Sequence, residues 1–340
     1  MRALVITRHG GPEVLQVREM ADPQPGARQV LVRVRAAGLN FAEIMARQGL
    51  YLDAPKPPCV VGYEASGVVE QVGSEVTEFQ IGDRVIAMIQ FGSHAELIAA
   101  AVDEVLPMPA NMSFEQAAAL PVNYLTAYHM LHRVAHVRSG QRLLIHSAAG
   151  GVGIAVIQLC QAVGGVELFG TASAGKHAYL REIGLDHPID YRTEDYVDAV
   201  RTLTNGQGVD IVLDPLGGKD WRKGYRLLRP AGHLCAYGFS NNTSGDGTRS
   251  LLRVLGQMAQ VPLWNSISLM NENRAVSGVN MGHLWGEKAM LREELMALLG
   301  LFAAGKIAPK IDSTFPFDQA ADAHRRIESR GSIGKVLLVP

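Results

Sequence analysis

One segment constrains the fold more than any other: a strand pattern that runs directly into a glycine-rich turn and then a helix. Arg142–Ser147 has the sequence RLLIHS, Ala148–Gly153 has the sequence AAGGVG, and the apolar run Val152–Val163 is typical of a buried helix. Glycine lets the backbone approach a pyrophosphate, and the helix start offers unpaired amides and a positive dipole end. The first glycine of the usual G-x-G-x-x-G pattern is Ala148, so the strand–turn–helix context carries the prediction of a dinucleotide-binding loop.

Strand and helix patterns alternate from about residue 123 to residue 283. The apolar strand patterns lie at 142–147, 166–170, 187–191, 209–214 and 233–237, with helical stretches between them, and 274–281 is a candidate sixth strand. Alternation at this spacing predicts an α/β unit with a doubly wound parallel sheet of the Rossmann type.

The first 122 residues have a different pattern, in which short alternating strands are separated by glycine turns. They predict a partly open β-barrel with little helix apart from a turn around Asn40–Gln48. Ser113–Gln116 is a capping box that starts a short helix, and Pro121 is expected to end or bend it. The tail 284–340 is expected to return to this first domain, so that 1–122 plus 284–340 form one domain and 123–283 the other.

Composition and charge narrow the range of functions. A length of 340 residues suits two domains, and a formal net charge of −1 excludes the strong positive field expected of a nucleic-acid-binding surface. No apolar run is long enough to span a membrane, and the N-terminal residues predict a first strand and no signal peptide. We therefore expect a cytoplasmic protein that binds neither nucleic acid nor membranes.

The end of the second strand in the alternating region distinguishes NAD from NADP. An NAD site usually places an Asp or Glu there to hold the ribose hydroxyls, but Gly170–Ser173 contains no carboxylate. Ser173, Lys176 and Tyr191 instead offer hydroxyls and an ammonium group to a 2′-phosphate. A surface lysine at a helix start is the plain alternative for Lys176, but the missing acid independently favours NADP(H).

Several motifs taken together resemble the medium-chain dehydrogenase/reductase superfamily. They are AAGLNFAEIMARQGLY around Asn40, GYEASG at 62–67, the GDRV turn at 82–85 and AAGGVG at 148–153. Within that superfamily the chain resembles the zinc-independent quinone oxidoreductase (zeta-crystallin-like) branch, and its C-terminal part resembles the VAT-1-like subgroup. The resemblance implies a GroES-like catalytic domain beside the Rossmann domain.

The same motifs also indicate whether the chain has the ligands of a catalytic zinc site. Zinc-dependent relatives carry a cysteine, a Gly-His-Glu motif and a four-cysteine lobe, whereas this chain has Asn40 and Tyr63 near the first two ligand positions. Its three cysteines, Cys59, Cys160 and Cys235, are far apart, and a catalytic zinc needs about three converging protein ligands. We therefore expect no metal.

Without a Lewis acid to polarise an alcohol or carbonyl, the expected substrates are quinones and α,β-unsaturated carbonyls, which already accept hydride. The resemblance places the nicotinamide in the cleft between the domains, with Asn40 bonding either the ribose or the substrate carbonyl. Tyr51 lies where related enoyl reductases place a tyrosine; it either orients the acceptor oxygen, helps deliver a proton, or only packs. Tyr63 is expected to line the same pocket, and water remains an alternative proton source.

The resemblance also implies further cofactor contacts, each with a plain structural alternative. Besides Asn40, Ser173, Lys176 and Tyr191, the expected cofactor-binding residues are Thr126, Ala149, Gly150, Gly151, Val152, Gly153, Gly238, Phe239, Ser240, Val279, Asn280 and Lys335. The sixth strand is expected to join two cofactor domains edge to edge in a homodimer. Three functions stay open: an NADPH-dependent quinone reductase, an enoyl or alkenal reductase, and an NADP(H)-binding VAT-1-like protein with little turnover.

Overall fold

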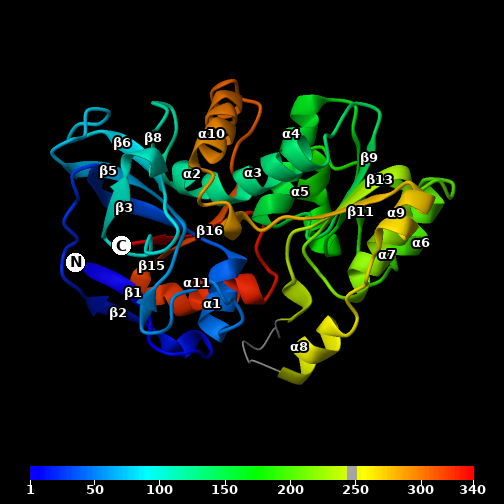
Figure 1. The fold of residues 1–340 in the computed structure, drawn as a ribbon, viewed down its shortest axis with the longest axis horizontal. Coiled ribbons are helices and arrows are strands. Elements are labelled where there is room, and N and C mark those ends of the chain that lie inside the picture. Colours follow the sequence, from blue (N-terminus) through cyan, green and yellow to red (C-terminus); the bar gives the residue numbers. More distant parts are fainter. Residues whose placement is uncertain (243–250) are drawn as a thin grey trace.

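The structure, a computed structural model, describes residues 1–242 and 251–340 (Figure 1). Two large sheets lie in opposite halves of the molecule, with α2 (Phe114–Ala119) and α3 (Pro121–Tyr128) between them. The expected α/β class is confirmed: one half carries a parallel Rossmann sheet and the other a GroES-like barrel.

The Rossmann sheet has six parallel strands in the order β11-β10-β9-β12-β13-β14. Their bounds are β9 Arg142–Ile145, β10 Glu167–Thr171, β11 His187–Ile189, β12 Val209–Asp214, β13 Leu228–Ala236 and β14 Ala275–Gly278. Strands β10 and β11 are added on one side of β9, and strands β12 to β14 are added on its other side. The point between β9 and β12 is therefore the topological switch point, where ligands bind in such folds. β14 is shorter than expected and is the last strand in this order, so it forms one edge.

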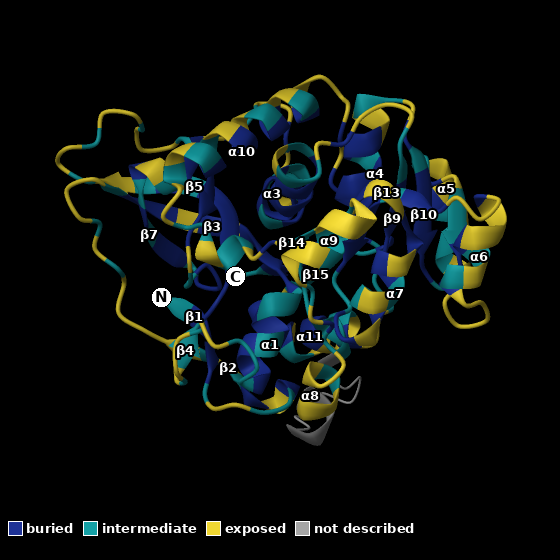
Figure 2. Cartoon of the chain, turned by 45° about the vertical axis from the view of Figure 1, so that its right-hand side comes forward, coloured by how far each residue is buried: buried dark blue, intermediate teal, exposed yellow. Residues whose placement is uncertain are grey.

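Helices cover both faces of this sheet, and the strands between them are buried (Figure 2). They are α4 Gly151–Val163, α5 His177–Glu182, α6 Tyr196–Leu203 and α7 Lys219–Leu227. Two more helices follow in the chain, α8 Leu251–Met258, which lies away from the sheet (Figure 1), and α9 Ser266–Glu272, which precedes β14. The continuous apolar sequence of α4 matches its burial, since Ile154, Ile157 and Leu159 are at most 1% exposed.

The other half is built mainly from antiparallel strands. A seven-stranded sheet contains β3 Gln29–Leu39, β5 Glu64–Val72, β6 Arg84–Met88, β7 Leu97–Ala101, β8 Val105–Pro107, β15 Ile311–Pro316 and β16 Lys335–Val339. A smaller sheet pairs β1 Arg2–Ile6 with β2 Leu15–Glu19 and β4 Cys59–Val60. β16 pairs with β3, so the C-terminal tail does return to the N-terminal sheet.

The helices of this half lie at the edges of its sheets. α1 Phe41–Gln48 follows β3, α10 Lys288–Ala303 lies beside α3, and α11 Ala320–Glu328 packs on β16. Leu295 and Leu298 of α10 belong to one apolar core with Ile145 of β9 and Leu106 of β8, so this core is continuous between the two halves.

The junction around residue 120 differs in one respect from the sequence expectation. Ser113 caps α2 as expected: its hydroxyl accepts from the Gln116 amide, and Gln116 accepts from the Ser113 amide. Pro121 ends α2 but also occupies the first turn of α3, where its missing N–H would have no helical partner in any case. Proline therefore bends the chain here and starts a new helix.

Candidate functional site

The glycine-rich loop is hydrogen-bonded to Gly334, which directly precedes the C-terminal strand β16. Gly150 caps α4 and forms an isolated bridge with Gly334, whose amide donates to the Ala149 carbonyl at 2.9 Å. Gly151 and Val152 begin α4, so their amides lie in its first turn, where they have no helical acceptor. Five residues expected to bind the cofactor are thus brought to one helix start, next to Lys335.

A side chain at each of the three glycines of this loop would meet a different neighbour. A Cβ on Gly153 would collide with the backbone of Ala148, so glycine is needed for close packing of α4 on the strand. A Cβ on Gly151 would collide with the Asn123 side chain of α3. A Cβ on Gly150 would meet only the Ser147 carbonyl, at 3.2 Å. The loop is therefore tight against the protein at Gly151 and Gly153 and open at Gly150, as a phosphate-binding loop requires.

A buried charged cluster lies directly beyond this loop. The Lys335 ammonium donates to Asn40 Oδ1 at 2.6 Å and forms a short ion pair with Glu64, and both charged side chains are at most 3% exposed. Asn40 caps α1 and donates from Nδ2 to Glu64 Oε1 at 3.0 Å. Glu64 also accepts from the Val122 amide at the start of α3, 2.7 Å away. Asn40 and Lys335, expected to bind cofactor from opposite ends of the sequence, are therefore direct partners.

Aromatic side chains meet near this cluster, at the boundary between the two halves. The ring of Tyr63 stacks on Trp285 with centroids 6.2 Å apart and planes 11° apart, and it also contacts the ring of Phe91 with centroids 5.3 Å apart. The Tyr51 hydroxyl lies against Gly282, and burial raises the pKa of both tyrosines. These rings form one wall from four separate segments, which we call the aromatic wall (Tyr51, Tyr63, Phe91 and Trp285).

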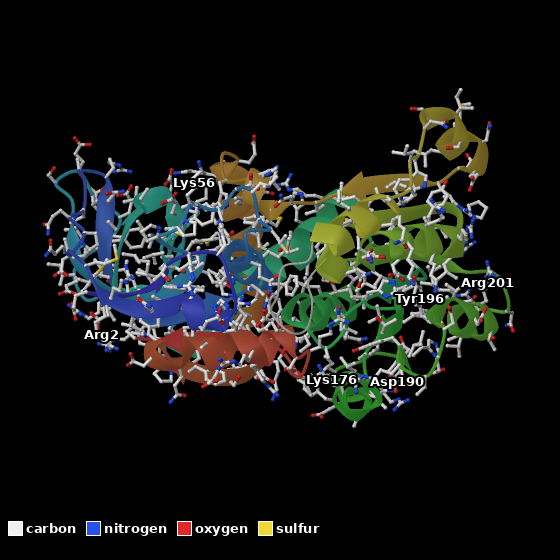
Figure 3. The ribbon with its side chains drawn as sticks, turned by 90° about the horizontal axis from the view of Figure 1, so that it is seen from below. Arg2, Lys56, Lys176, Asp190, Tyr196 and Arg201 are labelled. Carbon is white, nitrogen blue, oxygen red and sulfur yellow. The ribbon has the colours of Figure 1, made fainter. Side chains whose placement is uncertain are left out.

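The three residues expected to bind the 2′-phosphate, which are Ser173, Lys176 and Tyr191, have different surroundings. Ser173 precedes a short 3-10 turn, and Tyr191 follows β11 with 40% of its surface exposed. The ammonium of Lys176 donates to the carbonyls of Arg330 and Ser332 at 2.8 and 2.6 Å, so it is held beside the segment after α11 (Figure 3). Burial, then the charges of Arg326 and Arg192, lower the pKa of Lys176. Arg326, which pairs with Asp312, and Arg192 are therefore two further cations near Lys176, and the sequence reasoning missed both.

The remaining expected contacts lie at strand ends or on α3. Thr126 donates to the Val122 carbonyl at 2.7 Å, the Val279 amide bonds the Ala236 carbonyl at 2.8 Å, and Asn280 accepts from the Gly282 amide at 3.0 Å. Gly238, Phe239 and Ser240 follow β13, and the Phe239 ring packs on Trp221 with centroids 5.2 Å apart. All of these except Thr126 lie at the carboxyl edge of the parallel sheet.

Beneath the loop lies a buried polar row that the sequence did not single out. His146 Nδ1 is 3.1 Å from the Thr171 hydroxyl, and His146 Nε2 is 3.9 Å from Asp214 Oδ2. Burial lowers the pKa of His146 to about 4, so its ring is neutral near pH 7, and burial raises the pKa of Asp214 to about 7.

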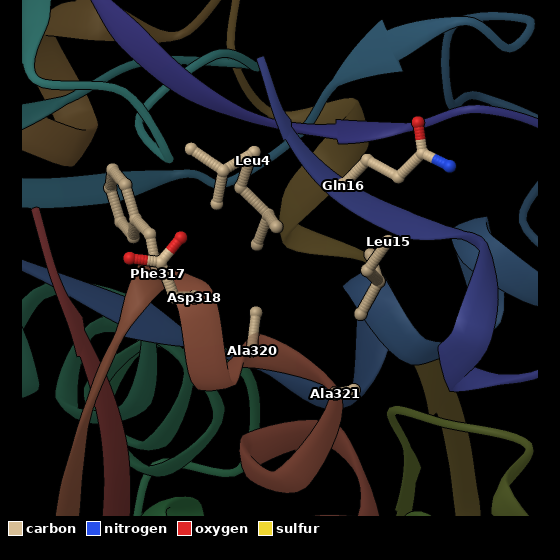
Figure 4. Close-up of a pocket in the computed structure, with 8 residues that line it drawn as sticks. Leu4, Leu15, Gln16, Phe317, Asp318, Ala320 and Ala321 are labelled. Carbon is tan, nitrogen blue, oxygen red and sulfur yellow. The ribbon is translucent and has the colours of Figure 1, made fainter.

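A separate groove of about 300 Å³ lies between the small sheet and the start of α11, in the half that contains the N-terminus (Figure 4). Its lining includes Leu4 and Leu15 of the small sheet and Phe317 and Ala320 at the start of α11. Most of these side chains are apolar and none belongs to the sets described above.

Comparisons with known proteins agree with this architecture. Residues 26–110 match the family model of the alcohol dehydrogenase GroES-like domain, and residues 183–338 match that of zinc-binding dehydrogenases. A quinone oxidoreductase of Pseudomonas aeruginosa is 36% identical over 334 residues, covering 98% of this chain and 97% of the relative.

The chain belongs to the medium-chain dehydrogenase/reductase superfamily. Within this superfamily it is 46% identical over 338 residues to a zebrafish (Danio rerio) protein named synaptic vesicle membrane protein VAT-1 homolog, covering 99% of this chain and 69% of the relative. The crystal structure of an Escherichia coli quinone oxidoreductase complexed with NADPH is 31% identical with a TM-score of 0.87, covering all of both chains. The CurK enoyl reductase structure is 26% identical with a TM-score of 0.85, covering 99% and 98%.

The structure places an ion pair beside Asn40, one of the two residues that the sequence resemblance assigns to zinc-ligand positions of zinc-dependent relatives. Asn40 and Tyr63, at the expected ligand positions, contact Lys335 and the aromatic wall respectively. Among residues 1–242 and 251–340, no three His, Cys, Asp or Glu side chains are grouped so that they could hold a metal ion. A cation therefore does lie beside Glu64, but it is the ammonium of Lys335.

Proposed function

We propose that this chain is an NADPH-dependent, zinc-independent oxidoreductase that reduces quinones at the aromatic wall. The observation that carries the proposal is the stacking of Tyr63 on Trp285, which joins the catalytic half to the segment after β14. This wall lies next to the Asn40–Glu64–Lys335 cluster, and that cluster adjoins the glycine-rich loop.

The residues present fit NADP(H). The open backbone at Gly150 and the first turn of α4 would hold the pyrophosphate, with Ser173, Lys176, Tyr191 and Arg192 at the 2′-phosphate. Two similar structures, from Escherichia coli and from a mycobacterium, are described as complexes with NADPH. When bound, the nicotinamide supplies a hydride, and the protein has to orient its ring and exclude water.

The side chains suit a planar, electron-poor acceptor. Aromatic rings bind flat rings by offset stacking, and Tyr63, at the centre of the wall, is only 5% exposed to water. The hydroxyls of Tyr51 and Tyr63 would bond the acceptor oxygen and orient it. The raised pKa values of these tyrosines keep both hydroxyls protonated, and therefore able to donate, at neutral pH.

Two other functions have support. Similarity to the CurK enoyl reductase favours reduction of an activated carbon–carbon double bond on the same scaffold. Higher identity to VAT-1 homologues favours a cofactor-binding protein with little turnover. The same site would bind NADPH in all three cases, so the acceptor distinguishes them.

NADPH oxidation tests these alternatives. We expect turnover with 1,4-benzoquinone or 9,10-phenanthrenequinone that exceeds turnover with a short enone, prefers NADPH over NADH and is insensitive to a chelator. Faster reduction of the enone would select the alkene reductase, and NADPH binding without turnover would select the binding protein. Inhibition by the chelator would contradict the zinc-independent mechanism.

We also propose a homodimer joined through the edge strand β14. α9, which precedes this strand, is largely exposed (Figure 2), and its Ile267 and Met270 are 68% and 67% exposed. An unpaired edge beside exposed apolar side chains is a natural place for a second copy to pair. Sedimentation should give twice the chain mass of 36.7 kDa, whereas a monomer at micromolar concentration would contradict the dimer.

The expected domain limits and location are retained as proposals. The pairing of β16 with β3 supports assigning residues 284–340 to the domain of residues 1–122, leaving 123–283 as the cofactor domain. We propose a cytoplasmic location without nucleic-acid or membrane partners. Within the described part of the chain, no helix combines the length and apolar character needed to cross a bilayer.

A further inference from the structure

Residues 282–285, a short segment that follows the edge strand β14, contact the catalytic half at three places. The hydroxyl of Tyr51 lies against Gly282, and Nε2 of His283 is 2.7 Å from a carboxylate oxygen of Asp53. The third contact is the stacked ring pair of the aromatic wall, 6.2 Å between centroids. The loop that follows α1 therefore runs along this segment of the cofactor half and meets it directly.

Glycine at position 282 is explained by a neighbour and not by the backbone. The main chain of Gly282 lies outside the left-handed region that favours glycine. A Cβ at this position would collide with the Tyr51 hydroxyl oxygen, whereas the Tyr51 Cζ atom would be at an ordinary contact distance of 3.6 Å. The missing side chain is thus what lets this hydroxyl approach the main chain so closely.

Gly282 is also bonded to the part of the cofactor half that is expected to hold the nicotinamide. Its amide donates to Asn280 Oδ1 at 3.0 Å. Asn280 and Val279 are the residues expected at the carboxamide, and the Val279 amide donates to the Ala236 carbonyl of β13 at 2.8 Å. The Tyr51 hydroxyl, which comes from the other half, therefore rests on the main chain two residues beyond Asn280.

We propose that Gly282 is a positioning residue for the electron acceptor and acts through Tyr51. The inference rests on the proposed reductase function, in which the Tyr51 hydroxyl bonds the acceptor oxygen and the cofactor half holds the hydride donor. Hydride transfer needs the reacting atoms about 3–3.5 Å apart. The contact of the Tyr51 hydroxyl with Gly282 fixes the group that orients the acceptor relative to the half that carries the nicotinamide.

Gly282→Ala tests the proposal because its Cβ displaces the hydroxyl without removing any polar group. A misplacement of about 1 Å can cost about 100-fold, so we expect kcat/KM for 1,4-benzoquinone, or for a short enone if the wild type prefers it, to fall by about that factor. The Kd for NADPH should be unchanged. Gly286→Ala is the matched control, because Gly286 directly follows the segment and a Cβ there would meet no atom within 4 Å; its acceptor kinetics should equal those of the wild type.

Tyr51→Phe supplies the second measurement, because phenylalanine lacks the oxygen that the new Cβ would meet. Tyr51→Phe should itself lower kcat/KM for the acceptor, but adding Gly282→Ala to it should cause a further loss of only about threefold or less, a clear departure from additivity. If Gly282→Ala does not fold, the same change should be tolerated in the Tyr51→Phe background, and failure to fold there as well would overturn the proposal.

The outcomes separate this proposal from the function on which it rests. Unchanged acceptor kinetics in Gly282→Ala, or equal losses with and without the Tyr51 hydroxyl, would overturn the positioning role and leave the reductase function standing. A weaker Kd for NADPH with unchanged acceptor KM would also overturn it, because the alanine would then act through Asn280, whose Oδ1 would be 3.1 Å from the new Cβ. A wild-type protein without turnover would remove both the function and the inference.

Discussion

Replacing Lys335 with methionine should isolate the contribution of a charge that balances Glu64 inside the catalytic half. Methionine keeps much of the side-chain volume but leaves Glu64, which is 0% exposed, without its ammonium partner. Breaking a buried ion pair on one side costs about 3–5 kcal/mol, because the remaining charge is uncompensated. With an unfolding entropy of about 2.1 cal/mol/K per residue, this corresponds to a decrease in Tm of about 4–7 °C for 340 residues.

The assay is thermal unfolding without cofactor, followed by circular dichroism, so that any effect on NADPH binding does not enter. Lys335→Met combined with Glu64→Gln removes both charges and should recover most of the lost Tm. A single variant within about 1 kcal/mol of the wild type, or a double variant no more stable than the single one, would refute the charge-balance reasoning.

Four further results are expected. Gly153→Ala should lower NADPH affinity more than tenfold in a fluorescence titration, because a Cβ there meets the Ala148 backbone, whereas Gly300→Ala in α10, with open space around it, should bind normally. Lys176→Met and Arg192→Ser should each reduce the ratio of kcat/KM for NADPH to that for NADH by about 10- to 100-fold, and equal losses for both cofactors would contradict the 2′-phosphate assignment. Asp214 should make the native state less stable as the pH rises from about 4 to 7, because burial raises its pKa to about 7 and the folded chain binds a proton that the unfolded chain releases; Asp214→Asn should flatten this slope in urea unfolding. A thiol reagent should label Cys59 alone in the native protein, since burial raises the pKa of Cys160 to about 12 and of Cys235 to about 11; rapid labelling of either would show that its surroundings open.

The sequence predicted the cofactor half well because its signals are local. The strand, glycine turn and helix at 142–163 are consecutive, and the apolar strands alternate with helices at regular spacing. The return of the tail to the first sheet was expected from the organisation of the chain, and the importance of Asn40 followed from motif resemblance. Predicted strand limits differed by a few residues, as with the short β14, because pairing partners decide where a strand ends.

The parts that the sequence missed depend on contacts between distant segments. Glu64 and Lys335 are 271 positions apart, and neither residue type indicates by itself that the two will be buried together. Trp285 follows a short turn without a regular pattern, so its stacking on Tyr63 has no sequence signal. Arg192 lies in an exposed turn where arginine is common.

The pairing of the C-terminal strand β16 with β3 has a consequence for biosynthesis. β3 lacks its β16 neighbour, and Glu64 lacks its ammonium partner, until the ribosome has released residues up to Val339. The Rossmann strands, by contrast, are all encoded before residue 279 and can pair earlier. The N-terminal sheet is therefore translated first but completed last, and a nascent chain that stops before Lys335 would expose an unpaired strand and a buried acid without its counter-ion.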